Sequence, residues 1–457
     1  MTNYVILGTG VAGIAAAQAI RAIDKQGTIT FISEDPHWYY SRPGLAYYLT
    51  GEIEEKQLFP FQPEDYKALN AHFWQATAVK ILPQEQFVAL NDGKRVPYDR
   101  LLISVGASAS RLKVPGAELE GVVKLDHMED ARQIVARSKR ARSAVVVGGG
   151  ITALELAEGL ALRRLKVHLL IRTNRYWSNV LDEAESKIIQ HRLKEDRINV
   201  HYESELDEVL GKQGKVVGVR LKSGQQIDCD MLAYAIGIQP RIKLAKESGI
   251  TCDRGILADE HLRTNQPNIF AAGDVAQVYD PVSGRSVIDS LWTPAREQGH
   301  IAGSNMAGKS LAYIKSVSFN VTRLAGLTTT IIGNVGVGTD SAENPFVIAR
   351  GDSETWRDMP DAIIAQNGFD INHVRLMLTG KYIVGAIVMG DQKLSSALQT
   401  IVRDRLDISS IREQLLAPNA PIADILAKFW TQIYNSRNSG TGSGAASTVV
   451  LQKASVR

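Results

Sequence analysis

The chain has 457 residues, of which 44% are hydrophobic and 22% are charged, and its formal net charge is +3. This composition is typical of a soluble globular protein of roughly two to four domains, and the small net charge excludes nucleic acid as the main partner. The two cysteines, Cys229 and Cys252, have no metal-binding spacing, so we expect neither a disulfide scaffold nor a metal site. No apolar run reaches the roughly 18–20 residues that span a membrane, and no signal peptide is recognisable, which predicts a cytoplasmic protein.

The first motif follows an apolar run at residues 4–7 and precedes a predicted helix at 14–22. It has the form G-x-G-x-x-G, which binds the pyrophosphate of a dinucleotide. The first glycine permits a tight turn, the second permits close approach, and the third lets strand and helix pack. The N-terminus of the helix attracts the phosphates. The residues that we expect to bind here are Gly8, Gly10, Val11, Ala12 and Gly13.

A predicted second strand at residues 28–32 ends just before Glu34. An acidic residue in this place suits a carboxylate that accepts hydrogen bonds from a ribose diol, here the adenosine ribose of the first dinucleotide. The alternative is a solvated loop carboxylate.

A second glycine motif follows the apolar run at residues 144–147 and opens a helix with apolar residues at helical spacing. The residues that we expect to bind a second dinucleotide are Gly148, Gly150, Ile151, Thr152 and Ala153. One such motif is a weak signal. Two of them, each between a strand and a helix, indicate that electrons pass from one bound dinucleotide to the other.

The predicted strand at residues 166–171 is followed by Arg172 and Arg175, where an NAD site would place an acidic residue. Arginines there would bind a 2′-phosphate with charge-assisted hydrogen bonds, and alanine at the third motif position, here Ala153, also occurs in NADP sites. The sequence therefore favours NADPH over NADH. The alternative is that both arginines are surface residues that do not discriminate between the two.

A third unit at about residues 319–434 contains helices and strand-like runs at 328–332, 374–378 and 383–388. Its last helix, 422–434, carries an apolar stripe without a flanking basic cluster, so we expect core or dimer packing rather than contact with a membrane surface. The Ser/Gly/Thr-rich residues after Asn435 are predicted to be disordered.

Four further motifs occur at residues 98–106, 235–240, 268–274 and 292–299. Together with the two glycine motifs they cover about residues 1–310. In this order they make the chain resemble the FAD-dependent pyridine nucleotide-disulfide oxidoreductases, which have two dinucleotide-binding domains. The resemblance implies an α/β fold with two Rossmann-like domains and an α+β C-terminal interface domain. It also implies FAD and NADPH, or NADH, as cofactors, and a homodimer.

The resemblance implies a division of the chain as well. The expected parts are an FAD-binding domain formed by residues 1–118 and 245–318, an NAD(P)H-binding domain at 119–244, an interface domain at 319–435 and a disordered tail at 436–457. The segments that contain Gly106 and Gly237 look like the two crossings between the dinucleotide-binding domains.

The resemblance implies roles for two acidic residues, Asp274 and Glu155. Asp274, which follows Gly273, matches the residue that contacts the ribityl chain of the flavin, although an aspartate here also suits the N-cap of a helix. Glu155 matches a carboxylate close to the flavin and the nicotinamide. The alternative for Glu155 is a charged residue on the exposed side of its helix.

The segment at residues 40–51 departs from the family. It looks like the stretch that carries the redox cysteine of coenzyme A-disulfide reductases, but Pro43 stands in the place of the cysteine, and thiol–disulfide exchange needs a thiolate. Tyr47 stands where ferredoxin reductases of the dioxygenase type have a lysine. The segment is also similar to rubredoxin reductases and to the flavoprotein part of nitrite reductases. Arg42 either approaches the flavin or its pyrophosphate, or holds the loop through a surface ion pair.

We therefore expect an NAD(P)H-dependent FAD oxidoreductase with Glu155 and Arg42 at its catalytic centre. A hydride passes from NAD(P)H to FAD, and electrons leave the flavin directly for a small electron-transfer protein or a small-molecule acceptor such as a quinone. The alternatives are a quinone reductase at a membrane surface and a non-catalytic flavin-binding redox sensor. A further alternative, an NADH oxidase or peroxidase, is weakened by Pro43.

Overall fold

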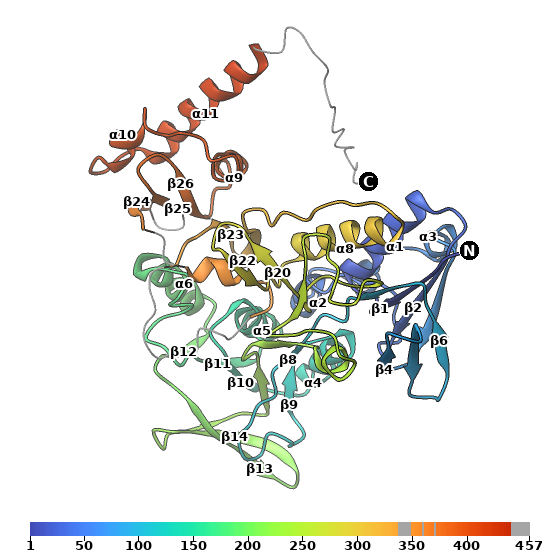
Figure 1. The fold of residues 1–457 in the computed structure, drawn as a ribbon. Coiled ribbons are helices and arrows are strands. Elements are labelled where there is room, and N and C mark those ends of the chain that lie inside the picture. Colours follow the sequence, from blue (N-terminus) through green and yellow to red (C-terminus); the bar gives the residue numbers. More distant parts are fainter. Residues whose placement is uncertain (337–348, 359–360, 370–371, 440–457) are drawn as a thin grey trace.

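A computed structural model describes residues 1–336, 349–358, 361–369 and 372–439 (Figure 1). The described residues form three five-stranded sheets with helices packed around them, which confirms the predicted α/β class. In Figure 1 the first sheet lies among the blue elements, the second among the green ones, and the third among the orange and red ones.

The first sheet is parallel throughout and has the strand order β19-β7-β1-β2-β3. Its strands are β1 (Asn3–Leu7), β2 (Thr28–Ser33), β3 (Ala71–Gln75), β7 (Arg100–Ile103) and β19 (Ile269–Ala271). Because β1 and β7 are neighbours, the turn after β1 presses against Ser104. A Cβ atom on Gly8 would lie 2.5 Å from the Ser104 carbonyl oxygen, and the φ angle of Gly8 is +100°, so glycine is required there.

The second sheet repeats this arrangement with the parallel order β12-β11-β10-β16-β9. Its strands are β9 (Val122–Lys124), β10 (Ser143–Val147), β11 (Lys166–Leu170), β12 (Asn199–His201) and β16 (Met231–Tyr234). The middle strands β1 and β10 are followed by α1 (Val11–Ile23) and α5 (Ile151–Leu162). Both glycine motifs therefore lie at the carboxyl end of a middle strand, which is where open α/β sheets bind ligands.

Helix α8 (Trp292–Met306) packs along α1 although the two are far apart in the sequence. Two glycines of α8 make this close approach possible, because a Cβ atom on Gly299 or Gly303 would collide with the carbonyl oxygen of Ala12 or Ala16. The middle of α8 is thereby held against the first glycine motif at Ala12.

The two predicted crossing segments lie side by side. Strands β8 (Ala107–Ala109) and β17 (Ile238–Pro240) form an antiparallel ribbon between the first two sheets. The Ser110 backbone N–H donates to the Gly237 carbonyl oxygen over 2.9 Å, which ties the two crossings together. The exact domain limits expected from the sequence stay predictions.

The third sheet is antiparallel with the order β22-β23-β26-β25-β24. Its elements are β22 (Phe319–Leu324), β23 (Leu327–Gly333), β24 (Ile363–Phe369), β25 (Asn372–Leu378), β26 (Ile383–Met389), α9 (Ser395–Arg403), α10 (Arg412–Leu416) and α11 (Ile422–Ser439). The stripe of α11 is buried in the core beside this sheet at Ile422, Leu426 and Phe429. Among the described helices, none has the length and apolarity needed to cross a lipid bilayer.

Helix α11 continues to Ser439, so the predicted end at Tyr434 and the predicted disorder of residues 436–439 are wrong. The rest of the predicted tail, residues 440–457, lies outside the described residues.

Three small sheets and several short helices complete the described chain. The small sheets contain β4 (Ala78–Leu82), β5 (Phe87–Leu90) and β6 (Arg95–Pro97); β13 (Leu206–Lys212), β14 (Lys215–Leu221) and β15 (Gln226–Asp228); β18 (Ile256–Ala258), β20 (Ala276–Asp280) and β21 (Arg285–Val287). The other helices are α2 (Gly44–Thr50), α3 (Pro63–Ala68), α4 (Met128–Ser138), α6 (Glu183–Glu195) and α7 (Lys243–Glu247), with 3-10 turns at Glu55–Leu58 and Glu354–Arg357.

Candidate cofactor site

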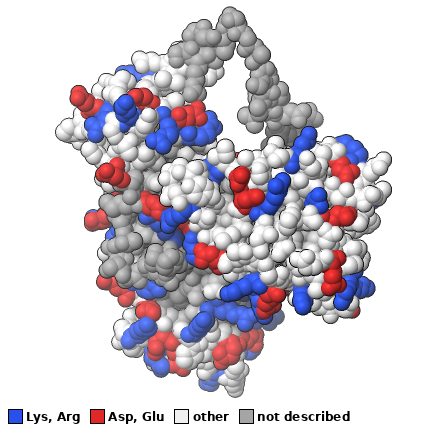
Figure 2. Space-filling view, in the orientation of Figure 1, with Lys and Arg blue, Asp and Glu red and all other residues white. Residues whose placement is uncertain are grey.

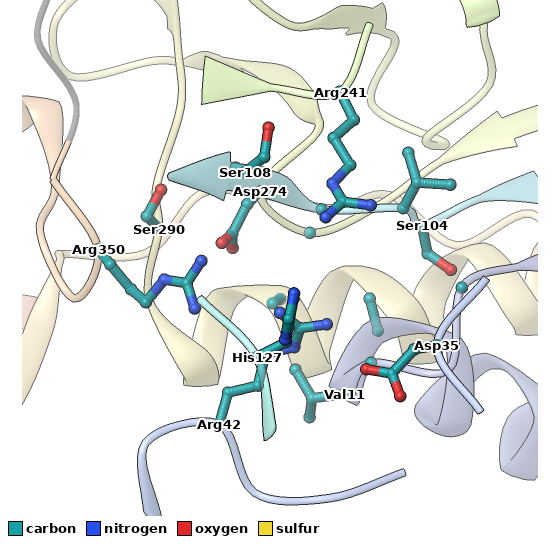
Figure 3. A pocket seen from close by; sticks show the side chains of 18 of the residues that line it. Val11, Asp35, Arg42, Ser104, Ser108, His127, Arg241, Asp274, Ser290 and Arg350 are labelled. Atoms are coloured by element: carbon teal, nitrogen blue, oxygen red, sulfur yellow. The ribbon is translucent and has the colours of Figure 1, made fainter. Parts of the chain in front are cut away.

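A cavity of about 1470 Å³ lies between the first two sheets and the edge of the third (Figure 3). This volume exceeds the roughly 300–1,000 Å³ of pockets for drug-sized ligands, so it suits a molecule as long as a dinucleotide. Its lining includes Glu34, Gly10, Asp274 and Glu155. The cavity therefore connects residues that the sequence analysis assigned to separate motifs.

The first glycine motif forms an open cradle in this cavity. Gly8, Gly10, Val11 and Ala12 all line it. A Cβ atom on Gly10 would meet no other atom within 4 Å, which leaves its face free for a ligand, whereas a Cβ atom on Gly13 would collide with the Gly8 carbonyl oxygen. Gly10 thus provides space and Gly13 provides packing, as expected for a pyrophosphate site.

Glu34 lies at the end of β2 and lines the cavity, where it forms an ion pair with Arg241. The arginine directly follows the crossing strand β17, and its backbone N–H donates to the Gly106 carbonyl oxygen over 3.0 Å. The sequence analysis did not find Arg241, and its position beside the crossing motif was the available signal. The contact of Glu34 with a ribose stays a prediction.

Two arginines that line the cavity, Arg42 and Arg350, donate to the same carbonyl oxygen. Arg42 donates from Nη1 to the backbone oxygen of Asp126 over 3.1 Å, and Arg350 donates to the same atom over 2.8 Å. Arg350 also pairs with the Asp126 carboxylate. Burial opposes the charge of Asp126, but Arg350 and the Ala109 N–H outweigh it and lower the pKa of that carboxyl. Arg42 is therefore held inside the site rather than in a surface ion pair.

Arg350 comes from the segment 349–352, which reaches the cavity from the third sheet's side of the molecule. Asn320 of β22 donates to the Gly351 carbonyl oxygen over 3.2 Å, and the Gly351 N–H donates to the Ser290 carbonyl oxygen over 3.0 Å. In Figure 3 the guanidinium group of Arg350 extends toward Asp274. No motif marks this arginine in the sequence, and only the fold brings it to the site.

Asp274 lies in the turn between β19 and β20 and lines the cavity. No helix begins there, so the N-cap alternative is wrong; the next helix, α8, starts at Trp292. Burial raises the pKa of the Asp274 carboxyl, and the positive charges of Arg350 and Arg42 partly offset this. Gly273 just before it has a φ of +80° and allows the turn.

Glu155 lies on the first turns of α5 and lines the cavity together with Ile151 and Thr152. It faces this interior space, so the alternative of a solvent-facing residue does not hold. Burial, followed by repulsion from Glu158, raises the pKa of Glu155 to about 8. A carboxyl that titrates this close to neutral pH suits proton transfer.

The second glycine motif has a neighbour from a distant segment, whereas the first has none at Gly10. Gly148 has a φ of +145°, and a Cβ atom there would collide with the Ala235 carbonyl oxygen. A Cβ atom on Gly150 would lie 3.7 Å from the Cβ of Ala349, in the segment that carries Arg350. Ala153, at the third position, is fully buried. A nucleotide at this motif must therefore share its surroundings with residues 349–351.

Arg172 and Arg175 follow β11 but differ in exposure and in hydrogen bonding. Arg172 is exposed just beyond the end of the strand. Arg175 donates from Nη2 to the Ser178 carbonyl oxygen over 2.9 Å and thus holds its own loop. Their contact with a 2′-phosphate stays a prediction, and the geometry favours Arg172 for it.

Pro43 occupies the position at which the resemblance expects a redox cysteine. Pro43 directly precedes α2 and lines the cavity, as does Tyr47 on the helix. Cys229 is buried in a different hydrophobic cluster, beside β14, and burial raises the pKa of its thiol to about 12. Neither Cys229 nor Cys252 belongs to the described lining of the cavity.

One cluster away from the cavity has the residue types of a metal site, namely Asp182, Glu185 and His373. Its cation is already supplied by Arg375, whose Nε donates to Glu185 over 3.0 Å in a fully buried ion pair. The cluster therefore joins α6 to β25 as an ion-pair network.

The family model for pyridine nucleotide-disulphide oxidoreductases matches residues 2–299. The chain belongs to this family. As a member it is an oxidoreductase with FAD and NAD(P)H as its cofactors, and the open cradle at Gly10 fits the first of them.

Relatives of this oxidoreductase include the rubredoxin-NAD(+) reductase of Ectopseudomonas oleovorans, which is 31% identical over 309 residues, or 67% of this chain and 80% of the relative. The nitrite reductase [NAD(P)H] of Bacillus subtilis is 27% identical over 410 residues; the match covers 89% of this chain but only 48% of that protein, so the chain spans about half of its length. The crystal structure of a ferredoxin reductase from Rhodopseudomonas palustris has a TM-score of 0.82 at 21% identity and covers 94% of this chain and all of its own. This last likeness shows the fold.

Proposed function

We propose that the chain is an NAD(P)H-dependent reductase that passes electrons singly to a small electron-transfer protein, directly from FAD and without a redox cysteine. The observation that carries this proposal is the single cavity that joins the first glycine motif to Arg42, Asp274 and Glu155. Its described lining contains no sulfur atom. The rubredoxin reductase named above supports an acceptor of this class.

We assign different roles to the residues that line the cavity. Gly10 and Glu34 would hold the ADP half of FAD, and Asp274 the ribityl chain. Arg42 and Arg350, both anchored on Asp126, bring two positive charges to the cavity, which would stabilise negative charge on a bound group. When bound, FAD accepts a hydride and releases electrons one at a time, which links a two-electron donor to one-electron acceptors.

The nicotinamide donor is NADPH in this proposal, because Arg172 is exposed beyond β11, where an acidic residue would otherwise repel the 2′-phosphate. We expect Arg172→Glu to lower the NADPH/NADH ratio of kcat/KM at least about tenfold, and Arg175→Gln to lower it less, since Arg175 binds its own loop. A ratio unchanged in Arg172→Glu contradicts the preference for NADPH.

The face shown in Figure 2 has no dominant charge, since basic and acidic side chains are interspersed on it, so charge does not mark a docking surface there. The apolar stripe of α11, which would support a quinone reductase at a membrane, is occupied by the core. A protein acceptor is therefore the better proposal. The homodimer and the cytoplasmic location stay predictions from the sequence.

The test is an anaerobic titration of the FAD-containing protein with NADPH and then NADH, followed by addition of an oxidised rubredoxin or ferredoxin. We expect one nucleotide to bleach the flavin band rapidly and the added protein to restore it. Failure of both nucleotides to bleach the flavin would contradict the reductase and favour a flavin-binding sensor. Rapid reoxidation by a quinone but by neither protein would contradict the acceptor class.

A further inference from the structure

A second, small cavity of about 20 Å³ lies beside the large one. One buried water needs roughly 10–15 Å³ and two to four polar partners, so this space suits a single water molecule. Its described lining consists of Ala46, Tyr47, Thr50, Glu155, Glu158 and Arg323. Glu155 lines both cavities and therefore stands at the boundary between them.

The two carboxylates of this lining face the same way. Glu155 and Glu158 are three positions apart on α5, which places them on one face of the helix. Glu158 is only 8% exposed and accepts a hydrogen bond from the Gly326 N–H over 2.9 Å. Within the described part of the chain, neither carboxylate has an ion-pair partner, since Arg323 pairs with Glu52 and Arg350 with Asp126.

The far side of the small cavity reaches solvent. The ion pair of Arg323 with Glu52 is partly exposed, at 32% and 40% of the two side chains. Thr50 lines the cavity and donates from its hydroxyl to the Glu52 carboxylate over 2.8 Å. Glu158 is thus separated from bulk water by a thin polar layer.

Charged and titratable groups from several elements surround Glu155 and Glu158. Besides each other, the groups are Arg350, Arg323, Glu52, Asp196 and Tyr176. Burial dominates for both carboxyls and raises the pKa of Glu155 to about 8 and that of Glu158 to about 7. Both groups can therefore take up and release a proton near neutral pH.

The proposed function requires a proton to leave the large cavity. One NAD(P)H that reduces two one-electron acceptors yields NAD(P)⁺, two reduced acceptors and one proton. We propose that Glu155 and Glu158, bridged by one water in the small cavity, conduct this proton to the solvent beside Glu52 and Arg323. A Glu155 oxygen takes the proton and donates it to the water, the water donates one of its own protons to a Glu158 oxygen, and Glu158 releases that proton to the exterior. This role rests on the proposed function.

The test uses Glu158→Gln in the FAD-containing protein. Glutamine keeps an oxygen that can accept from the Gly326 N–H but cannot exchange a proton. The protein is mixed rapidly with NAD(P)H and ferricyanide, a one-electron acceptor, while a pH indicator records proton release. We expect Glu158→Gln to bleach its flavin at the normal rate but to release protons about a hundredfold more slowly, with recovery in Glu158→Asp or on adding formate.

The matched control is Glu183→Gln, which removes the same charge from a solvent-exposed position on α6. Proton release in Glu158→Gln as fast as in this control would overturn the relay. An equal slowing of bleaching and proton release would also overturn it, because it would indicate a structural role.

A second measurement does not depend on turnover. Infrared titration of the protein should show two protonated carboxyls that ionise between about pH 6 and 9, and one in Glu158→Gln, with a lower pKa for Glu155 because the repulsion from Glu158 is gone. Absence of any carboxyl that titrates in this range would overturn the relay and leave the proposed function standing. A normal titration in a protein that NAD(P)H does not bleach would contradict the proposed function, and with it the proton that the relay is proposed to carry.

Discussion

The turns after β1 and β10 share their backbone requirement and differ in their surroundings. Gly8 and Gly148 both have positive φ angles, and a Cβ atom on either would press against a carbonyl oxygen of the adjacent strand end. Beyond this first glycine, Gly10 faces open space, whereas Gly150 faces Ala349. The motif therefore determines the turn, but residues distant in the sequence determine how accessible each site is.

The helices that follow the two turns differ as well. Helix α1 has no acidic residue and packs against the glycines of α8. Helix α5 carries Glu155 and Glu158, both directed into interior spaces. The helix after the first motif thus brings no acidic side chain to the cavity, whereas the helix after the second motif places titratable carboxyls beside it.

The largest expected effect lies at the third motif position. A Cβ atom in Gly13→Ala would collide with the Gly8 carbonyl oxygen and crowd Ile6 and Ser104 at 3.2 Å, so we expect a loss of about 3 kcal/mol or more in the free energy of unfolding. The matched change at the second motif, Ala153→Gly, should cost only about 1 kcal/mol through helix propensity. Urea unfolding of both variants measures the difference. Equal losses would mean that the two turns do not differ in packing.

A substitution at Gly10, the second motif position, distinguishes a role in ligand binding from a role in protein packing. Gly10→Ala adds a methyl group where no protein atom lies within 4 Å. We expect FAD affinity to fall about a hundredfold, or roughly 2.7 kcal/mol, because the methyl group enters the pyrophosphate space. The free energy of unfolding of the FAD-free protein should stay within about 0.5 kcal/mol. Flavin fluorescence measures the affinity and urea unfolding measures the stability. A loss of unfolding free energy in Gly10→Ala as large as that in Gly13→Ala would argue against a cradle at Gly10.

The carboxyls of α5 predict a pH dependence that α1 cannot provide. The pKa values of Glu155 and Glu158 are about 8 and about 7 in the folded protein, above the ordinary value of 4.5. The folded state therefore retains protons that the unfolded chain releases, and stability falls as pH rises from about 5 to about 8. The stability of the double variant Glu155→Gln/Glu158→Gln should therefore fall much less over this pH range than that of the parent, because both titrating carboxyls are gone. Parallel stability curves for the variant and the parent would contradict the buried pair.

The smallest expected effect tests the cover over the second motif. Ala349→Leu enlarges the side chain that faces Gly150, so we expect the Kd for NAD(P)H to rise about tenfold while the FAD content is unchanged. Ala349→Gly is the matched control and should bind NAD(P)H at least as tightly as the parent. If both variants bind NAD(P)H equally, the segment 349–351 does not limit access to this motif.

The sequence by itself determined the α/β class, both glycine turns and the family, since each motif depends on residues that are close together in the chain. A glycine at a turn is required by local backbone geometry, so its motif can be read without knowledge of the fold.

Only the tertiary structure decided the rest. It placed Asp274 in a turn before a strand, brought Arg241 to Glu34, and anchored Arg350 on Asp126, 224 positions away. It also enclosed Glu158 with Arg323 around a space for one water. These contacts depend on packing between segments of different sheets, and no local pattern in the sequence records which distant side chains will meet.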